Sequence, residues 1–281
     1  MTEAGETSTL ANEGFRSVLV ATDLSEGSDL LVHTAAAIAE RSGGALHVVH
    51  AAEGDEGEER ARHALGEQAR RVAPAAQLHV ASTAPDRAIA ERAEAVRADL
   101  VVVGPHVRGA GSGFLGSTAE RVLGSAGVPC LVARVPLVPS VRHVVAAVDP
   151  AHRLDAVLES AVRWALLFGG AAGVPHVSAL YVTGDRSDGP PPELEGALSL
   201  ALARCHALDR VNASVALRGT DVVESIVLYV EVEASDLLVL STRNRGMLGR
   251  ALLGSVSSEV TRRAPCNVLL VPPPSDDDAG P

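Results

Sequence analysis

The strongest constraint on this chain is that its sequence repeats itself. The segment RSVLVATDLSEGSDLLVHTAAAIAERSGGALHVVHA, which begins at Arg16, corresponds to RHVVAAVDPAHRLDAVLESAVRWALLFGGAAGVPHVSALYV, which begins at Arg142. Later in each half, RADLVVVGPHVRGAGSGFLGSTAERVLGSAGVPCLVARVP corresponds to ASDLLVLSTRNRGMLGRALLGSVSSEVTRRAPCNVLLVPP. A chain of 281 residues has room for two domains of ordinary size. We therefore expect two copies of one domain, at residues 15–138 and 141–273.

Each half alternates short apolar segments with amphipathic segments, which is typical of βαβ units and a parallel sheet. Residues 98–103 and 235–240 end in unbroken apolar runs, as strands buried on both faces require. The predicted fold class is therefore α/β. The junction RVPLVPSVR is short and carries two prolines, so the two domains are expected to pack closely. Residues 1–14 and 274–281 are polar tails that we expect to be disordered.

Charge and composition exclude several classes of function. A formal net charge of −11 and an aromatic content of 2% argue against nucleic-acid binding, which needs a basic surface or aromatic stacking platforms. All 24 basic residues are arginine. The absence of lysine from the sequence removes a P-loop lysine, Schiff-base chemistry and a lysine general base.

The three cysteines, Cys130, Cys205 and Cys266, form no CxxC pair and no even disulfide framework. Cys130 and Cys266 lie beside the last predicted strands, where we expect small buried side chains. No segment approaches the roughly 18 apolar residues that a membrane span needs. The N-terminal MTEAGETSTLANEG does not resemble a signal peptide. We therefore expect a cytoplasmic protein with no membrane partner.

Two aspartates, Asp23 and Asp149, come directly after the first apolar segment of each repeat. An acidic residue at the carboxyl end of a central parallel strand points into the crevice where open α/β sheets bind ligands. Its carboxylate can accept hydrogen bonds from ribose hydroxyls or hold a metal near phosphates. The alternative is an ordinary helix N-cap, since aspartate is common there. Pro150 lacks an N–H but suits the start of a helix.

A loop rich in glycine or serine follows the fourth apolar segment of each repeat. It reads GPHVRGAGSGFLGST at residues 104–118 and STRNRGMLGRALLGSVSS at residues 241–258. Each loop leads through Gly-Ser into an amphipathic helix, so backbone donors, hydroxyls and a helix N-terminus can surround a phosphate. Arg243, Arg245 and Arg250 would add positive charge there. The alternative is a flexible, solvated surface loop with a serine cap.

With these motifs the chain resembles the universal stress protein family, and the similarity covers nearly the whole chain, twice. Members carry a first turn such as ATD-x-S or VD-x-S, a G-x2-G-x9-G-[S/T] phosphate loop and a closing strand like APCPVLVV. The counterparts here are ATDLS and AVDPA, the two loops above, and VPCLVAR and APCNVLLV. The resemblance implies two tandem doubly wound five-stranded parallel sheets of the adenine nucleotide α-hydrolase-like type, packed as a pseudo-two-fold pair.

The resemblance also implies a stress-response regulator that binds ATP or a related adenine nucleotide, with or without Mg²⁺, in one or both domains. In ATP-binding members the early aspartate contacts the sugar or metal region and the glycine loop wraps the phosphates. No residue is expected to be catalytic, and slow ATP hydrolysis is the most activity expected. The nucleotide-binding residues predicted in this way are Ala21, Thr22, Asp23, Val49, Gly104, Gly109, Gly116, Ser117, Thr118, Ala147, Asp149, Ser241, Arg243, Asn244, Gly254, Ser255, Val256 and Ser257.

Both loops depart from the family pattern. Ser241 and Asn244 stand at the first two glycine positions of domain two, which keeps the nine-residue spacing to Gly254. Domain one keeps Gly104, but it has Val107 at the second glycine position and is one residue short. These departures support a second hypothesis, a family scaffold or interaction protein that has lost nucleotide binding.

Two enzyme-like interpretations fail on their motifs. Residues 111–116, GSGFLG, match the dinucleotide fingerprint GxGxxG, but they follow the fourth strand rather than the first. The position about 20 residues further on, where that fingerprint has an acid, is Pro136. An ATP pyrophosphatase would carry an SGGxDS-like loop after the first strand, which ATDLSEG and AVDPAHR do not match.

The remaining expectations concern packing and association. His47 and His50 are three residues apart on a predicted strand, so they should lie on opposite faces and share no metal. The resemblance also implies that the two last strands, residues 129–135 and 267–271, pair within the chain, which would cover two exposed edges. The resemblance leaves open a homodimer of two chains.

Overall fold

The computed structural model describes residues 14–52, 55–105, 127–137, 141–150, 154–169, 173–183, 190–219, 221–242 and 254–272. The chain divides into two compact units, Met1–Val102 and Val103–Pro281. The predicted tails lie outside the described residues apart from Gly14, and so does most of each predicted loop. None of the helices in the described ranges is long and apolar enough to cross a membrane.

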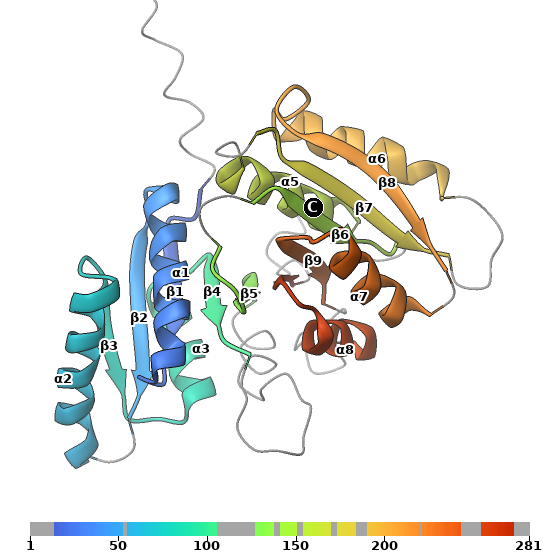
Figure 1. Cartoon of the computed structure of the whole chain (residues 1–281). Coiled ribbons are helices and arrows are strands. Elements are labelled where there is room, and N and C mark those ends of the chain that lie inside the picture. Colours follow the sequence, from blue (N-terminus) through green and yellow to red (C-terminus); the bar gives the residue numbers. More distant parts are fainter. Residues whose placement is uncertain are drawn as a thin grey trace, which may run out of the picture. The chain divides into compact units, whose positions relative to one another are not determined.

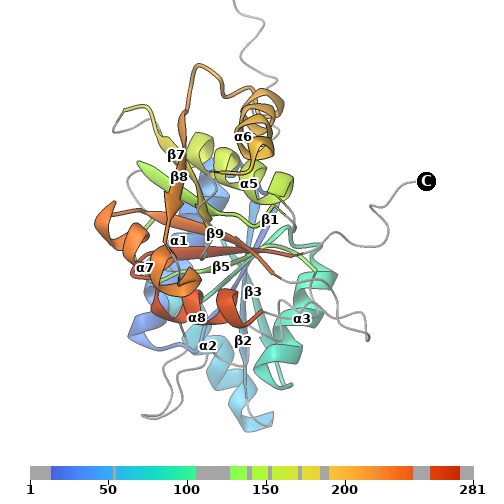
Figure 2. The same cartoon turned by 90° about the vertical axis from the view of Figure 1, so that its right-hand side faces the viewer.

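The first unit is a parallel sheet covered by helices. Its elements are β1 (Ser17–Ala21), α1 (Glu26–Ser42), β2 (Ala45–Ala51), α2 (Asp55–Val72), β3 (Gln77–Ala81), α3 (Pro85–Ala95) and β4 (Leu100–Val103), whose last residue falls in the second unit. The strand order is β3-β2-β1-β4, and all these pairings are parallel. Figure 2 shows α1 and α2 on one side of these strands and α3 on the other. Cover on both faces explains the unbroken apolar sequences of β1 and β4.

Local sequence determines how α1 begins, ends and packs. Ser25 is its extended N-cap, and Gly43 ends it in the left-handed conformation at φ 65°. Leu31, Ile38 and their neighbours on one face of the helix are buried against the sheet. The chain then returns to β2 through Gly44, where a Cβ atom would lie 2.0 Å from the carbonyl oxygen of Phe15. Only glycine allows this close approach of the α1–β2 turn to the start of β1.

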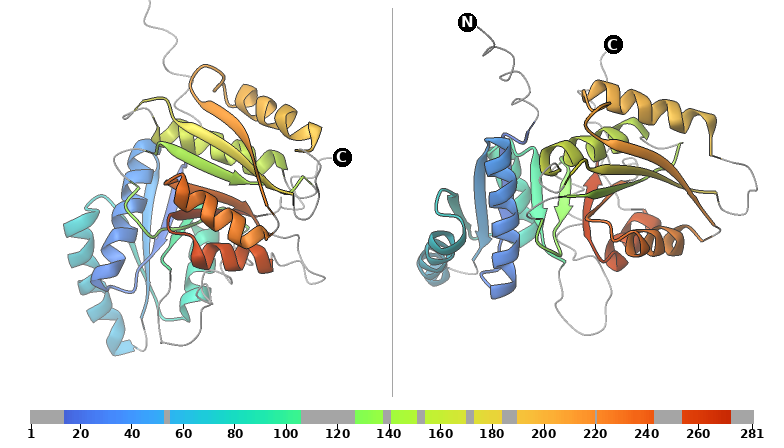
Figure 3. Two further views of the ribbon diagram at one scale, coloured as in Figure 1. Left: turned by 45° about the vertical axis from the view of Figure 1, so that its right-hand side comes forward. Right: turned by 45° about the horizontal axis from the view of Figure 1, so that its top comes forward.

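The second unit repeats this arrangement. Its elements are β5 (Cys130–Val132), β6 (His143–Ala147), α5 (Leu154–Phe168), β7 (His176–Val182), α6 (Pro192–Arg204), β8 (Asn212–Arg218), α7 (Val222–Val232), β9 (Leu237–Ser241), α8 (Ser255–Arg263) and β10 (Asn267–Val271). The strand order is β5-β10-β9-β6-β7-β8, with β6 to β10 mutually parallel. Figures 1 and 3 show α5 and α6 on one face of this sheet and α7 and α8 on the other. The predicted α/β class and doubly wound topology are confirmed.

Strand β5 comes from the end of the first predicted domain, yet it belongs to the second compact unit. It pairs antiparallel with β10, so that Val132 lies opposite Val268 and Cys130 lies opposite Leu270. The observed strand covers residues 130–132 only, which is shorter than the predicted strand at 129–135. The repeat boundaries at residues 138 and 141 stay a prediction.

The order of the strands places a switch point in each unit. In the second unit the chain runs from β6 to β7 and β8 on one side, and then crosses to β9 and β10 on the other side of β6. In the first unit it runs from β1 to β2 and β3, and then crosses to β4. Open α/β sheets bind ligands outside the carboxyl ends of the strands at such a point. The crevices to inspect therefore lie beyond β1 and β4, and beyond β6 and β9.

Candidate nucleotide-binding site

Asp23 lies just beyond β1, exposed at the switch-point edge of the first unit. Its Oδ1 accepts hydrogen bonds from the amide of Ser25 (3.0 Å), from the Ser25 hydroxyl (2.6 Å) and from the hydroxyl of Ser28. Between them, Leu24 adopts φ 62°, a conformation uncommon for a branched aliphatic residue. Asp23 thus organises the turn into α1 although Ser25, not Asp23, is the N-cap. Its carboxylate is held in one place at the edge of the sheet.

Thr22 ties this turn to its neighbours and is 6% exposed. Its amide donates to the carbonyl oxygen of Val49 (3.0 Å), and its hydroxyl donates to Oε1 of Gln68 on α2 (2.9 Å). Nδ1 of His50 donates to the carbonyl oxygen of Thr22 (2.9 Å). Val49 itself is buried, so it supports the turn from the core, while Ala21 ends β1 at the partly exposed edge. The contacts of Gln68 and His50 with Thr22 were not predicted, because nothing in the local sequence marks such tertiary contacts.

The second unit builds the same edge from different residues. The amide of Val148 donates to the carbonyl oxygen of Leu180 (2.9 Å), the counterpart of the Thr22–Val49 bond. Ala147 ends β6 and lies opposite Leu240 of β9. Asp149 follows, exposed at the same edge. The first strand of the second repeat therefore also delivers an aspartate to the switch point.

Helix α8 begins at this edge, directly after the second predicted loop. Gly254 is its extended N-cap, at φ −65° and ψ 159°, and no side chain caps the helix. The hydroxyl of Ser257 donates to the carbonyl oxygen of Ser241 (2.9 Å), which joins the first turn of α8 to the end of β9. Ser255 is exposed, and Val256 is partly exposed. The backbone amides of this first turn therefore lie next to the carboxyl end of β9.

The charge at the start of α8 differs from that of other helices in the described part of the chain. The first turns of α1, α3, α5, α6 and α7 each carry at least one acidic residue, whereas the first turn of α8 carries none. An acidic side chain neutralises the partial positive charge of a helix N-terminus. The start of α8 keeps that charge and is suited to an anion such as a phosphate.

The structure places the described members of the predicted site at two sheet edges, one in each unit. In the second unit, Ala147, Asp149, Ser241 and the Gly254–Ser257 turn meet at the carboxyl edge of β6 and β9. In the first unit, Ala21 and Val49 lie opposite each other where β1 ends, Thr22 and Asp23 follow β1, and Gly104 directly follows β4 along the chain. The predicted residues outside the described ranges are Gly109, Gly116, Ser117, Thr118, Arg243 and Asn244.

Histidines and cysteines build no metal site in the described ranges, where no group of three or more histidine, cysteine or acidic side chains could hold an ion. His47 contacts His79 rather than His50, whose ring bonds to Thr22 instead. Cys130 and Cys266 are buried as expected, and burial raises the pKa of each thiol to about 12.

The model of the universal stress protein family matches residues 14–59, 51–134 and 140–272, which is most of the chain. This chain belongs to the universal stress protein family. No curated protein matches it significantly. Among solved structures, a universal stress protein from Archaeoglobus fulgidus DSM 4304 is similar, with a TM-score of 0.70 and 22% identity over 95% of this chain and 99% of that one. A putative universal stress protein from Pseudomonas aeruginosa UCBPP-PA14 gives a TM-score of 0.66 and 19% identity over 94% and 95% of the two chains. At these identities the two structures show that the tandem fold is shared.

Proposed function

We propose that this universal stress protein is a stress-response regulator that binds an adenine nucleotide at the carboxyl edge of β6 and β9. The single observation that carries the proposal is the placement of Asp149 and of the first turn of α8, which carries no acidic residue, at the carboxyl ends of the adjacent strands β6 and β9. The α8 amides and the hydroxyl of Ser255 would hold the phosphates, and Asp149 would accept from the ribose hydroxyls.

The groups at this edge suit binding better than catalysis. Its described residues offer backbone amides, serine hydroxyls and one carboxylate, which are the groups that hold phosphates and ribose hydroxyls. A single carboxylate together with nucleotide phosphates is a common way to hold Mg²⁺, so Asp149 also fits a magnesium-bound ATP. Regulation would then come from occupancy of the site rather than from turnover.

We also propose that the β5–β10 pairing joins the two repeats. Pro129-Cys130 and Pro265-Cys266 occupy the same place in the repeated sequence, so Val132 and Val268 are equivalent positions. These two residues lie opposite each other in the antiparallel ladder. An antiparallel pairing centred on equivalent residues is the local signature of a two-fold relation between repeats.

The first test of nucleotide binding is the nucleotide content of protein purified without added ligand, followed by calorimetric titration with ATP and magnesium. About one or two equivalents of ATP or ADP in the denatured supernatant would support the proposal. Asp149→Ala and Asp23→Ala then assign the bound nucleotide to a repeat, and we expect Asp149→Ala to cause the larger loss of affinity.

A charge variant tests the role of α8 directly. Ser255→Glu places a carboxylate in the first turn, where it favours the helix but repels a phosphate. We expect ATP affinity to fall by about tenfold or more, which corresponds to about 1.4 kcal/mol, without a loss of thermal stability. Gln77→Glu, on the exposed edge strand β3, adds the same charge elsewhere and should leave affinity unchanged. Equal affinity of both variants would contradict phosphate binding at α8.

The second candidate function is a scaffold of the same family without nucleotide. It is favoured by Ser241 and Asn244, which stand where the family's phosphate loop has glycine. Protein that carries no nucleotide and shows no heat of binding at millimolar ATP with magnesium would establish this candidate over the first.

A further inference from the structure

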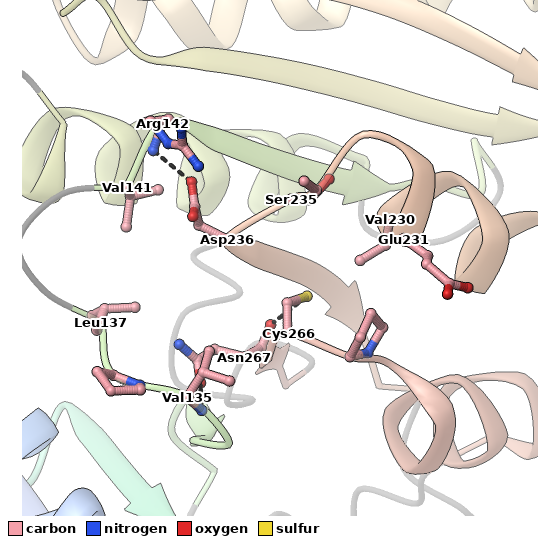
Figure 4. Close-up of a pocket in the computed structure, with 13 residues that line it drawn as sticks. Val135, Leu137, Val141, Arg142, Val230, Glu231, Ser235, Asp236, Cys266 and Asn267 are labelled. Carbon is pink, nitrogen blue, oxygen red and sulfur yellow. Dashed lines mark hydrogen bonds between the residues drawn. The ribbon is translucent and has the colours of Figure 1, made fainter. Parts of the chain in front are cut away.

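A pocket of about 540 Å³ lies in the second unit, away from the candidate nucleotide site (Figure 4). Arg142, Asp236 and Asn267 line it, and each stands at or just before the start of a strand, β6, β9 or β10. Asp149 and the first turn of α8 lie at the opposite, carboxyl ends of β6 and β9. The two sites are therefore separated by the length of the strands, and a ligand of one would not occupy the other.

Four segments line the pocket, and three of them supply the apolar residues described next. Val135 and Leu137 come from the chain after β5, Val141 comes from the chain before β6, and Val230 comes from α7. Leu137, Val141 and Val230 are at most 3% exposed, so they present a firm apolar lining. The volume lies within the range of small-molecule sites, which are mostly apolar with a few placed polar groups.

One of these polar groups is the side-chain amide of Asn267, which is 1% exposed. Its Oδ1 accepts from the backbone amides of Arg134 (2.8 Å) and Val135 (3.2 Å), which fixes the orientation of the amide. Its Nδ2 is buried and has no hydrogen-bond partner within the described part of the chain. Buried donors are normally paired, so this amide group points to an acceptor that the chain itself does not supply there. Figure 4 shows Asn267 beside Val135 at the pocket.

The second polar group is the guanidinium of Arg142, at the exposed rim (Figure 4). The neighbouring carboxylate of Asp236 accepts from the backbone amides of Arg142 (2.7 Å) and His143 (3.0 Å). The guanidinium itself makes no hydrogen bond or ion pair with any residue that the structure describes. Arg142 therefore offers a planar cation with several donors at the mouth of an apolar pocket.

We propose that this pocket binds a small amphipathic anion. A carboxylate or phosphate head pairs with the Arg142 guanidinium, the apolar body packs against Leu137, Val141 and Val230, and a ligand oxygen accepts from Nδ2 of Asn267. Residues 135–137 and 141–142, on the two sides of the junction between the repeats, line the pocket. A bound ligand would therefore contact the chain on both sides of that junction. The proposal does not depend on nucleotide binding, because the two sites share no residue.

The test uses the full chain and the fluorescent apolar anion 8-anilinonaphthalene-1-sulfonate, titrated first without ATP and then with millimolar ATP. We expect one saturable site per chain. Arg142→Ala should weaken binding at least fivefold, while Arg210→Ala, which removes the same charge from an exposed turn, should leave it unchanged. Ala234→Trp fills the pocket from an exposed position and should abolish binding. Absence of a saturable site, loss of the site on adding ATP, or equal binding by Arg142→Ala and the native chain would overturn the proposal.

Displacement of the dye identifies the chemistry of the head group. Decanoate and decyl phosphate should displace it, and the one effective at lower concentration identifies the preferred head as carboxylate or phosphate. Decanol, which has the same tail without a charge, should displace it at least tenfold less effectively. Equal displacement by decanol would show that the pocket selects apolar bodies alone, and it would refute the part assigned to Arg142.

Discussion

Nδ1 of His47 on β2 lies 3.2 Å from Nε2 of His79 on β3, and the two rings stack with their centroids 5.4 Å apart. A hydrogen bond between two imidazoles needs an N–H on one ring and a lone pair on the other. Burial, and then the positive charge of Arg92, lower the pKa of both side chains, that of His79 to about 4. The folded first unit therefore resists protonation of this pair at mildly acidic pH, where the histidines of an unfolded chain become protonated.

This pair should make the protein sensitive to acid. The pKa of an unfolded histidine is about 6.5, so between pH 6.5 and 4 the unfolded state takes up more protons and folding is weakened. The stability is complete above pH 6.5 and is lost as the pH falls toward 4. Because His79 is partly exposed, we expect about 1 kcal/mol of additional loss between pH 7.5 and pH 5 relative to His79→Gln.

The measurement is urea unfolding of the native chain and His79→Gln at these two pH values. His33→Gln is the matched control, because His33 is an exposed histidine on α1. It should follow the native pH dependence. Parallel pH dependences of the native chain and His79→Gln would mean that the pair contributes nothing.

Two equivalent aspartates fasten the start of the first strand in each repeat. Asp99 accepts from the backbone amides of Arg16 (2.8 Å) and Ser17 (3.2 Å), just as Asp236 accepts from Arg142 and His143. Replacing either carboxylate by alanine leaves two amides without their partner. We expect Asp99→Ala and Asp236→Ala each to lower the free energy of unfolding by about 2 kcal/mol.

Chemical denaturation checks this expectation, with Asp209→Ala as the control in an exposed turn of the second unit. Asp99→Asn should lose only part of that stability, because one amide oxygen still accepts. If the alanine variants are as stable as the Asp209→Ala control, the two carboxylates do not fasten the strands.

The repeated sequence predicted the fold class well, because hydrophobic periodicity and repetition are local signals. It also carried a sign of the Asp99–Asp236 equivalence, since RADL and ASDL stand before the same strand. It did not reveal the His47–His79 pair, because that contact depends on the register between β2 and β3. The first turn of α8 was predicted from Gly254 and Ser255, but its distinct charge emerges only by comparison with the starts of other described helices. The pocket at Asn267 had no sequence signal, since its four lining segments are separated along the chain.

Alanine substitutions at two glycines should have opposite effects on stability, because one glycine has open space at its Cβ position and the other does not. Gly66 lies inside α2 with open space around its Cβ position, so Gly66→Ala should stabilise the protein by about 0.5–1 kcal/mol. Gly44→Ala would place a methyl group 2.0 Å from a backbone oxygen and should prevent or severely weaken folding of the first unit. Thermal unfolding of both variants is the measurement. Loss of stability in Gly66→Ala would contradict the open surroundings of that position.

The buried thiols should report on the opening of the β5–β10 pairing. Cys130 and Cys266 are 0% and 4% exposed, and with pKa values of about 12 they have almost no thiolate at pH 8. An aromatic disulfide reagent should therefore label neither thiol quickly in the native protein, and it should label all three cysteines in guanidinium.

Under native conditions, slow labelling of a buried thiol requires local opening of the structure around it. Mass spectrometry can assign each labelling rate to a cysteine. Cys205 follows α6 beside the edge strand β8, so it should react before the other two. Cys130 lies within β5, and Cys266 immediately precedes β10, so opening of one ladder should expose both at similar rates. Immediate reaction of Cys130 in the native protein would show that β5 does not stay paired with β10.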